Sequence, residues 1–461
     1  MTRRREDPTL RDLTRLYLPV ALLVVTALAL LTPPFQVPDE QQHFFRAYQI
    51  SEAHIRSTAQ NGESGAVLPS SLIELSADFL GSRAIHTSQP VRPRPLADTL
   101  ASLAHPLDPD RREFIGFTGA ASYWPGAYLA QAVAIAIGRI TGLGPLGLLY
   151  AARLLNAWTA VALIAAALRL IPTGRRPLVV VALLPMTLYE IASCSADAAT
   201  IATSFLFTAI AASALATGQW RPASIASATA AALIFCPLKP VYAPLLLLAF
   251  PLGRKNASPS APARSLLAHA IILAAAIGTT IAWLASSPVE AAAPFPNVDP
   301  AAQLRFLADH PFRFLHTITL TSEINALPWA EQMIGVLGWL SVHLPWPMLA
   351  LPAALLLGCT LLQRSDPWRP DAPRAAWLIA IMLAGLSLIL LALALLWSPV
   401  GDLVVGGAQG RYFIPLAAAG CILIDGLLPL LPASLARAIT LLALAEAALT
   451  IRVVVRAFGL L

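Results

Sequence analysis

Long apolar runs constrain this chain more than any other feature, because several reach the roughly 20 residues that a helix needs to cross a bilayer. Hydrophobic residues make up 57% of the sequence and charged residues only 12%, whereas about 25% of a soluble domain is charged. The runs contain more Leu and Ala than β-branched residues, which favours spanning helices over a barrel. We therefore predict an all-α polytopic membrane protein.

The apolar runs, taken in order, predict about eleven transmembrane helices. The first occupies residues 16–34, after a basic tail over residues 1–15. Its length fits a retained anchor better than a cleaved signal peptide. The second span opens a multi-span region over residues 146–461. The spans of this region are expected at residues 146–170, 178–193, 197–217, 223–235, 241–252, 266–284, 346–362, 375–397, 412–431 and 435–455.

Basic residues set the expected orientation, because Lys and Arg beside spans are retained in the cytoplasm. The tail carries Arg at positions 3, 4 and 5, which predicts a cytoplasmic amino terminus and places Phe35 outside. If the apolar piece Tyr123 to Ile140 lies in the outer interface, four later basic loops also fall inside, so we predict an interfacial helix there. These loops account for much of the net charge of +6, and we expect no nucleic-acid partner.

Two polar regions are expected outside the membrane. Residues 35–145 form a loop far longer than the roughly 2–8 residues usual between helices, which indicates a functional role. This loop contains three short amphipathic pieces that we expect to be helical: Asp39 to Glu52, Ser70 to Leu80 and Leu96 to Leu103. A second outer loop is expected at about residues 286–344.

Asp39 and Glu40 follow the first predicted span directly. At the boundary between lipid and water, a carboxylate keeps its charge and can still face a lipid-borne substrate. One interpretation is helix capping with an interfacial anchor, since acidic residues are common in a first helical turn. A second is catalysis, with Asp39 as general base for an acceptor hydroxyl. A third is a site for Mg²⁺ or Mn²⁺ formed by Asp39, Glu40 and His43, and it is compatible with the second.

Other charged residues recur at the outer ends of predicted spans. Glu190 and Asp197 flank a short polar turn, Lys239 lies between two apolar runs, and Arg411 precedes a later span. A lone cation at a span end often extends to the interface without binding a ligand. Two cations and several carboxylates on one membrane face form the arrangement that a phosphate-bearing lipid requires. Lys239 and Arg411 would neutralise that phosphate.

Aromatic residues occur in the same outer segments, at Tyr123, Trp124, Trp329 and Trp339. They suit a platform on which a sugar ring stacks. They suit equally the aromatic belt that borders a bilayer, which is the commoner role. The sequence has no P-loop, no dinucleotide fingerprint and no serine-nucleophile motif.

The string from Pro34 to Tyr48 resembles a family of predicted bacterial membrane proteins called domain of unknown function 2142. Further family-like motifs are Tyr123-Trp124-Pro125, Leu184-Pro185-Met186-Thr187 with Ser193 and Asp197, Lys239-Pro240, Gly338-Trp339-Leu340 and Gln409-Gly410-Arg411-Tyr412. The chain departs from the family pattern at Trp124, where a Pro is expected, and at Ala196, where a polar residue is frequent.

The layout of this family resembles that of the GT-C glycosyltransferases, in which an acidic motif opens a large outer loop after the first span. The resemblance implies a bacterial inner-membrane enzyme that transfers sugar from a polyprenyl-phosphate donor to an acceptor on the outer face, in contact with membrane lipid and a lipid-linked sugar. It implies Asp39 as catalytic base and Glu40 as second carboxylate or metal ligand, with Lys239 and Arg411 binding the donor phosphate. The remaining motif residues are expected to contact the substrate: His43, Tyr123, Asp197, Gln409 and Tyr412.

Two other functions stay open at this point, because a shared layout does not establish activity. A transporter or flippase of a lipid-linked saccharide would carry ionisable residues near the middle of its spans, together with inverted repeats. A non-catalytic partner in polysaccharide assembly would keep the fold and use the acidic motif as a helix cap. Convergence of Asp39, Lys239 and Arg411 on one outward pocket is the geometry that favours an enzyme.

Overall fold

The computed structural model of this chain describes residues 8–81, 95–250, 261–287, 297–361, 370–425 and 433–460, and most of them are helical. Up to residue 140 the elements are α1 (Pro8–Leu31), α2 (Glu40–Ser51), β1 (Thr58–Gln60), β2 (Glu63–Pro69), α3 (Ser70–Leu80), α4 (Leu96–Ala101), η1 (Ser102–Ala104), β3 (Arg112–Gly116), α5 (Thr118–Ala121), η2 (Pro125–Tyr128) and α6 (Leu129–Ile140), where η denotes a 3-10 helix.

From residue 145 onward the elements are α7 (Pro145–Leu170), α8 (Arg175–Ala182), α9 (Pro185–Ile191), α10 (Asp197–Thr217), α11 (Pro222–Leu238), η3 (Pro240–Ala249), α12 (Ala261–Ser286), α13 (Pro300–Asp309), α14 (Pro311–Gly335), β4 (Val336–Leu337), β5 (Val342–His343), α15 (Trp346–Leu361), α16 (Ala372–Leu396), η4 (Gly410–Leu416), α17 (Ala417–Asp425) and α18 (Ala433–Ala457).

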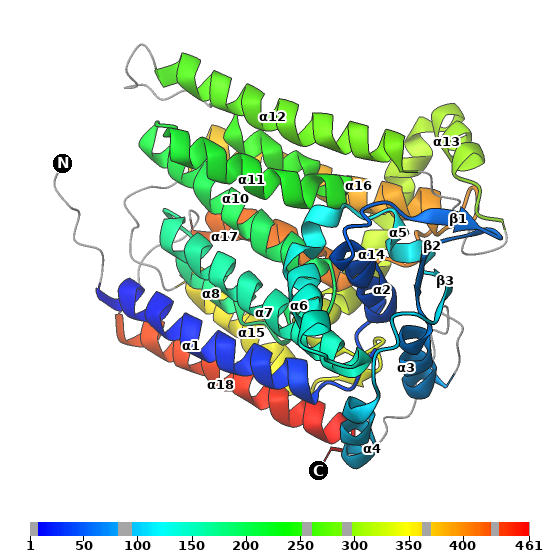
Figure 1. The fold of residues 1–461 in the computed structure, drawn as a ribbon. Helices are drawn as coiled ribbons and strands as arrows, with labels where there is room; N and C mark the ends of the chain where they lie inside the picture. Colours follow the sequence, from blue (N-terminus) through cyan, green and yellow to red (C-terminus); the bar gives the residue numbers. More distant parts are fainter. Residues whose placement is uncertain are drawn as a thin grey trace.

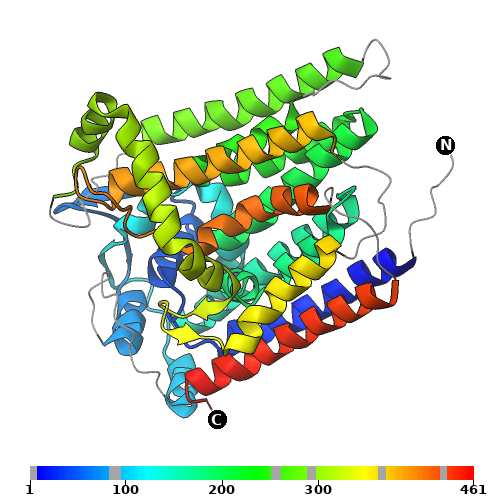
Figure 2. The same ribbon diagram turned by 180° about the vertical axis from the view of Figure 1, so that it is seen from behind.

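Most of the long helices lie roughly parallel in one bundle, and α14 runs at an angle to them (Figures 1 and 2). Helices α1 and α18 run side by side along one edge of this bundle, and α12 lies along the opposite edge (Figures 1 and 2). The strands β1 to β3 and the short helices α2 to α5 gather at the end of the bundle away from the chain's amino terminus (Figure 1). The described parts of the first predicted outer loop are therefore together at one end.

Four helices of the described chain are long and apolar enough to cross a membrane: α7, α10, α16 and Ala263–Ser286 of α12. Shorter apolar helices include α11 and Arg15–Leu31 of α1. These helices agree with a polytopic membrane protein, and the count of about eleven spans stays a prediction.

One expected span is divided in the structure. The sequence predicts a single helix over residues 178–193, whereas α8 ends at Ala182 and α9 begins at Pro185. Pro185 has no backbone N–H to donate, and a proline disfavours helical geometry in the residue before it, here Leu184 with ψ of 138°. The break brings the polar residues that follow α9 to the same end of the bundle as α2.

The expected interfacial piece at residues 123–140 is helical as η2 and α6. Helix α6 has 12 residues, which rise about 18 Å and cannot cross a hydrocarbon core of about 30 Å. Its position in the interface stays a prediction.

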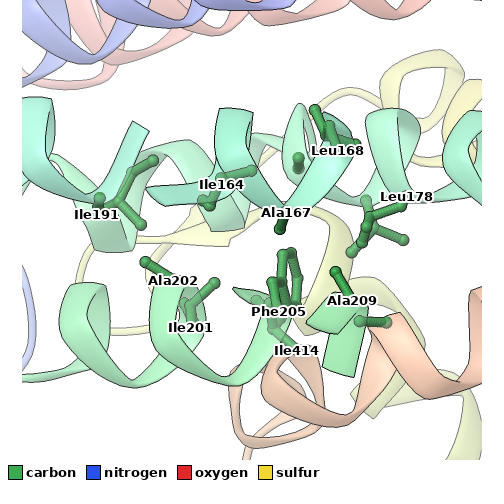
Figure 3. Close-up of a cluster of buried hydrophobic side chains, with 14 of the residues drawn as sticks. Ile164, Ala167, Leu168, Leu178, Ile191, Ile201, Ala202, Phe205, Ala209 and Ile414 are labelled. Atoms are coloured by element: carbon green, nitrogen blue, oxygen red, sulfur yellow. The ribbon is translucent and has the colours of Figure 1, made fainter. Parts of the chain in front are cut away.

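In the centre of the bundle, alanines such as Ala167 of α7 and Ala202 of α10 pack among larger apolar side chains (Figure 3). Ile164 and Ala167 of α7 face Ile201 and Phe205 of α10 (Figure 3). Small residues let helix backbones approach closely, so that van der Waals contact replaces the hydrophobic drive that is missing in lipid. Ile414 of η4 packs in the same cluster (Figure 3). The core therefore fixes the position of η4, which carries Arg411.

The first predicted outer loop also contains a sheet that an all-α prediction omits. Its order is β1-β2-β3, all antiparallel, with Ala59 opposite Ser64 and Ala66 opposite Ile115. The turn from β1 to β2 uses Asn61 at φ 52° and Gly62 at φ 79°. Asn-Gly is the dipeptide that most readily takes positive φ at both central positions of a two-residue hairpin.

Helix α2 is buried along most of its length, from Glu40 to Ile50. It packs against α6, α5, η2 and β2. Because its mean composition is polar, its side chains need partners within the fold. Gln41 contacts Ser76 of α3, and Gln42 Oε1 accepts from the Gly119 N–H at 2.7 Å. These bonds hold the first turn of α2, and with it Asp39, in a fixed place.

Candidate functional site

Asp39 precedes α2 in an unusual backbone conformation. Its φ of 63° and ψ of 0° are left-handed, whereas a residue that caps a helix with its side chain normally has extended backbone. The Asp39 carboxylate caps none of the α2 N–H groups that the structure describes. For a residue other than Gly this conformation costs on the order of 1 kcal/mol. The side chain is 49% exposed and serves a purpose other than capping α2.

Arg411 is the cation nearest to that carboxylate. Its Nη2 lies 3.6 Å from Asp39 Oδ2, which is longer than a hydrogen bond. Its Nη1 donates to Glu190 Oε1 at 3.0 Å. The Arg411 side chain is 7% exposed and that of Glu190 is 1% exposed. Arg411 is therefore held firmly by Glu190 and only loosely by Asp39.

The backbone before Arg411 lies unusually close to α14. A Cβ at Gly410 would fall 2.0 Å from the carbonyl oxygen of Trp329, so only glycine fits. The Gly410 N–H donates to Gln332 Oε1 at 2.9 Å. This contact orients η4 so that Arg411 is directed to α2 and α9.

Lys239 lies between α11 and η3 and forms an ion pair with Asp197 at the start of α10. The ring of Tyr412 lies beside both cations, with its centroid 5.8 Å from Lys239 Nζ and 5.4 Å from Arg411 Cζ. Such distances permit a cation–π attraction. The Tyr412 carbonyl accepts from Tyr242 Oη at 2.9 Å, which connects η4 to η3.

His43 is one helical turn after Asp39 on α2. Its Nδ1 lies 2.7 Å from Tyr128 Oη, and its ring centroid lies 5.6 Å from that of Tyr123. Burial lowers the pKa of His43 to about 4, while Asp39 and Asp197 act to raise it and Lys239 and Arg411 act to lower it. The imidazole is therefore neutral near pH 7.

The residues expected to form one site thus do come together, apart from Glu40. Asp39 and His43 come from the start of α2, Asp197 from α10, Lys239 from the end of α11, and Arg411 and Tyr412 from η4. We call the set Asp39, His43, Glu190, Asp197, Lys239, Arg411 and Tyr412 the charged cluster. Gln409 is two residues before Arg411, and the Tyr123 ring lies against His43. With His43 neutral, the cluster holds three carboxylates and two cations.

Glu40 does not join the charged cluster. It is 0% exposed and forms a buried ion pair with Arg153 of α7, whose Nε and Nη2 lie 2.7 Å and 2.5 Å from its two oxygens. The same two oxygens accept from the N–H groups of Cys194 at 2.9 Å and Phe35 at 3.0 Å. Glu40 is therefore fully hydrogen-bonded within the fold.

Arg153 connects Glu40 to the end of α1. Its Nη1 donates to the carbonyls of Ala29 at 2.9 Å and Thr32 at 2.6 Å, and its Nη2 donates to Pro33 at 3.1 Å. The last carbonyls of a helix have no partner within it, so Arg153 satisfies them as well as the carboxylate. Sequence reasoning missed this residue, although a lone arginine inside an apolar run is a signal for a buried partner.

The donor set does not fit a divalent cation held by Asp39 and Glu40. Both Glu40 oxygens already accept hydrogen bonds from Arg153 and from backbone N–H groups. Across the described ranges, no group of three or more His, Cys, Asp or Glu side chains could hold a metal ion. We derive no step through a metal.

Two of the tryptophans expected in outer segments, Trp329 and Trp339, donate to backbone carbonyls near the site. Trp339 Nε1 donates to the Phe35 carbonyl at 3.2 Å, and Trp329 Nε1 donates to the Ala408 carbonyl at 3.1 Å. The rings of Trp124 and Trp283 meet edge to face at 5.2 Å. The rings of Tyr123 and Tyr128 lie against His43 of the charged cluster, and Tyr412 belongs to the cluster.

The chain belongs to the family described as predicted membrane protein, domain of unknown function 2142, whose model matches residues 22–419. The match covers every residue of the charged cluster and ends before α18. No curated protein and no solved structure matches the chain.

Proposed function

We propose that this protein is a membrane glycosyltransferase that moves a sugar from a polyprenyl-phosphate donor to an acceptor hydroxyl on the extracytoplasmic face of a bacterial inner membrane. The observation that carries the proposal is that Asp39 lies 3.6 Å from Arg411, and that Arg411 and Lys239 both lie beside the ring of Tyr412. A transfer from a lipid phosphate needs a base for the acceptor and cations for the leaving phosphate.

Asp39 is the base in this proposal. Its carboxylate is half exposed, caps no described N–H group of α2, and lies beyond hydrogen-bond distance of Arg411. It would take the proton of the acceptor hydroxyl while that oxygen bonds to the anomeric carbon. The bond from the anomeric carbon to the phosphate oxygen breaks in the same step, with inversion at that carbon.

Lys239 and Arg411 would stabilise the departing polyprenyl phosphate, which gains a negative charge as its bond to the sugar breaks. Each cation already has a carboxylate partner, Asp197 or Glu190. These partners hold the cations in position before the donor arrives, so little reorganisation is needed during the reaction. The donor phosphate would take the place of Asp39 beside Arg411 Nη2, which frees the Asp39 carboxylate to accept a proton.

The test is transfer by purified protein in lipid nanodiscs. A panel of radiolabelled polyprenyl-phosphate sugars is incubated with the protein and with bacterial envelope material as acceptor. We expect label to move from at least one donor to the acceptor, with release of polyprenyl phosphate. Asp371→Asn serves as control, because Asp371 is an exposed carboxylate at the start of α16. Absence of transfer across the panel, with intact folded protein, would refute the proposal.

A further inference from the structure

The ion pair between Arg411 and Glu190 leaves two complementary atoms unused. Arg411 Nη1 donates to Glu190 Oε1 at 3.0 Å, but Arg411 Nε and Glu190 Oε2 are buried with no hydrogen-bond partner in the described part of the chain. Gln409, two residues earlier, carries a third such atom, Oε1. One unused donor and two unused acceptors therefore come from η4 and α9, beside Asp39.

A buried polar atom without a hydrogen-bond partner lowers the stability of the fold. Each costs roughly 1–3 kcal/mol, and more for a charged group, so folded proteins normally pair them with protein or ordered water. Here both charged side chains are more than nine-tenths buried. An arginine and a glutamate in contact could form a two-bond fork that uses both carboxylate oxygens. This pair does not, which leaves one donor and one acceptor without a partner among the described residues.

The donor and acceptor types narrow the class of molecule that would satisfy them. A phosphate oxygen accepts and could satisfy Arg411 Nε, but it has no proton for Glu190 Oε2. An ammonium group donates and could satisfy Glu190 Oε2, but it offers no lone pair to Arg411. Hydroxyl groups both donate and accept hydrogen bonds, so two neighbouring hydroxyls could satisfy both atoms, one accepting from Arg411 Nε and the other donating to Glu190 Oε2. Adjacent hydroxyls on a sugar ring would also reach a third atom such as Gln409 Oε1.

We propose that Glu190, Arg411 and Gln409 form a hydroxyl subsite that holds the ring of the transferred sugar. This inference rests on the proposed function and assigns recognition of the sugar to different atoms from those that bind its phosphate. Arg411 Nη2, which lies 3.6 Å from Asp39 Oδ2, and Lys239 remain assigned to the phosphate. The sugar is thereby placed with its anomeric carbon next to the proposed base.

The experiment measures equilibrium binding of two probes to protein in nanodiscs: polyprenyl phosphate without sugar, and the same lipid carrying glucose, galactose, mannose or arabinose. The readout is the ratio of the two dissociation constants. We expect the wild-type protein to bind one sugar-bearing lipid more tightly. Glu190→Gln should reduce that preference on the order of ten- to a hundredfold, because a hydrogen bond to a charged group is lost, and the ratio cancels the change in phosphate affinity that follows when Arg411 loses its carboxylate partner.

Glu446→Gln is the matched control. Glu446 of α18 is 3% exposed and also has a carboxylate oxygen without a partner among the described residues, but it lies outside the charged cluster. Binding of the sugar-free lipid doubles as the check for folding. If Glu190→Gln fails that check, Gln409→Leu takes its place with the same expected loss of preference.

Three results would overturn the inference, and they differ in what else they affect. A preference that persists in Glu190→Gln or Gln409→Leu means that the sugar is recognised elsewhere. Equal binding of sugar-free and sugar-bearing lipids by the wild type means that the subsite holds only water, while the phosphate site stands. Failure of the wild type to bind any of these lipids removes the proposed function along with the subsite.

Discussion

The carboxylate of Asp39 and the guanidinium of Arg411 face each other across 3.6 Å, although one precedes α2 and the other belongs to η4 near the end of the chain. The first is half exposed and held in left-handed backbone, and the second is buried against Glu190. A half-exposed carboxylate beside a buried, paired cation is an arrangement in which a competing anion can displace the carboxylate without disturbing the fold.

Asp39→Asn should abolish transfer and leave the protein folded. Asn tolerates the left-handed conformation at this position, and the weak contact with Arg411 contributes little to stability. Loss of a general base lowers a rate by about 10²- to 10⁴-fold. We therefore expect sugar transfer to fall by at least about 10²-fold, with a melting temperature in detergent close to that of the wild type and of Asp371→Asn. Undiminished transfer by the folded variant would remove Asp39 from the reaction.

Variants of Lys239 and Asp197 distinguish a structural role of Lys239 from a role in binding phosphate. Lys239→Gln leaves the Asp197 carboxylate without its cation, and removing one partner of a largely buried pair costs on the order of 3 kcal/mol. The double variant Lys239→Gln/Asp197→Asn should recover most of that stability in thermal unfolding. It should not recover affinity for polyprenyl phosphate, because the phosphate still lacks the cation. Recovery of both properties would show that Lys239 acts only through Asp197.

Within residues 35–145, the helices were easier to predict from the sequence than the strands. The pieces expected at residues 39–52, 70–80 and 96–103 correspond to α2, α3 and α4 with η1, because amphipathic spacing is a local signal. Strand β1 has only three residues, all exposed, so periodicity misses the β1–β2 hairpin. Asn61-Gly62 was the available signal, since this dipeptide favours a hairpin turn.

Contacts between residues far apart in the sequence explain the remaining differences between the predicted and the observed site. Nothing local in the sequence tells Glu40 apart from Asp39 as a site residue, yet Glu40 pairs with Arg153 and Asp39 does not. The pairing depends on where α7 passes the end of α1, which is a property of the packed bundle. In contrast, charged residues at the ends of predicted spans did indicate the charged cluster. Burying a charge in lipid is unfavourable, so such residues are confined to the boundary between lipid and water.

Glu40 and Arg153 should behave as one unit in stability measurements. Glu40→Gln or Arg153→Met alone leaves a buried partner uncompensated and is expected to cost about 3–5 kcal/mol. The double variant should lose clearly less than the sum of the two single losses, because neither charge is then buried alone. Denaturant or thermal unfolding of the three variants in one detergent measures this coupling. Strictly additive losses would mean that the pair is not an energetic unit.

His43 should make the folded protein sensitive to acid. Burial lowers its pKa from the ordinary 6.5 to about 4 in the fold, so between these values the unfolded chain binds a proton that the folded chain does not. The free energy of unfolding therefore falls as pH drops from about 6.5 to 4, by up to roughly 3 kcal/mol from this residue. His43→Gln retains an acceptor for Tyr128 and removes the titration.

The comparison is between two pH profiles of melting temperature, because carboxylates elsewhere contribute to both proteins. We expect the wild type to lose more stability than His43→Gln between pH 6.5 and pH 4.5. Parallel profiles would mean that His43 titrates normally in the folded protein.

The most direct test of the charged cluster is a cryo-electron microscopy structure of the protein in nanodiscs with a non-transferable polyprenyl-phosphate sugar analogue. We predict that the phosphate lies within hydrogen-bond distance of Lys239 Nζ and Arg411 Nη2, with the anomeric carbon turned to the Asp39 carboxylate. A phosphate bound at any other part of the protein, with Asp39 and Arg411 still facing each other, would contradict the account.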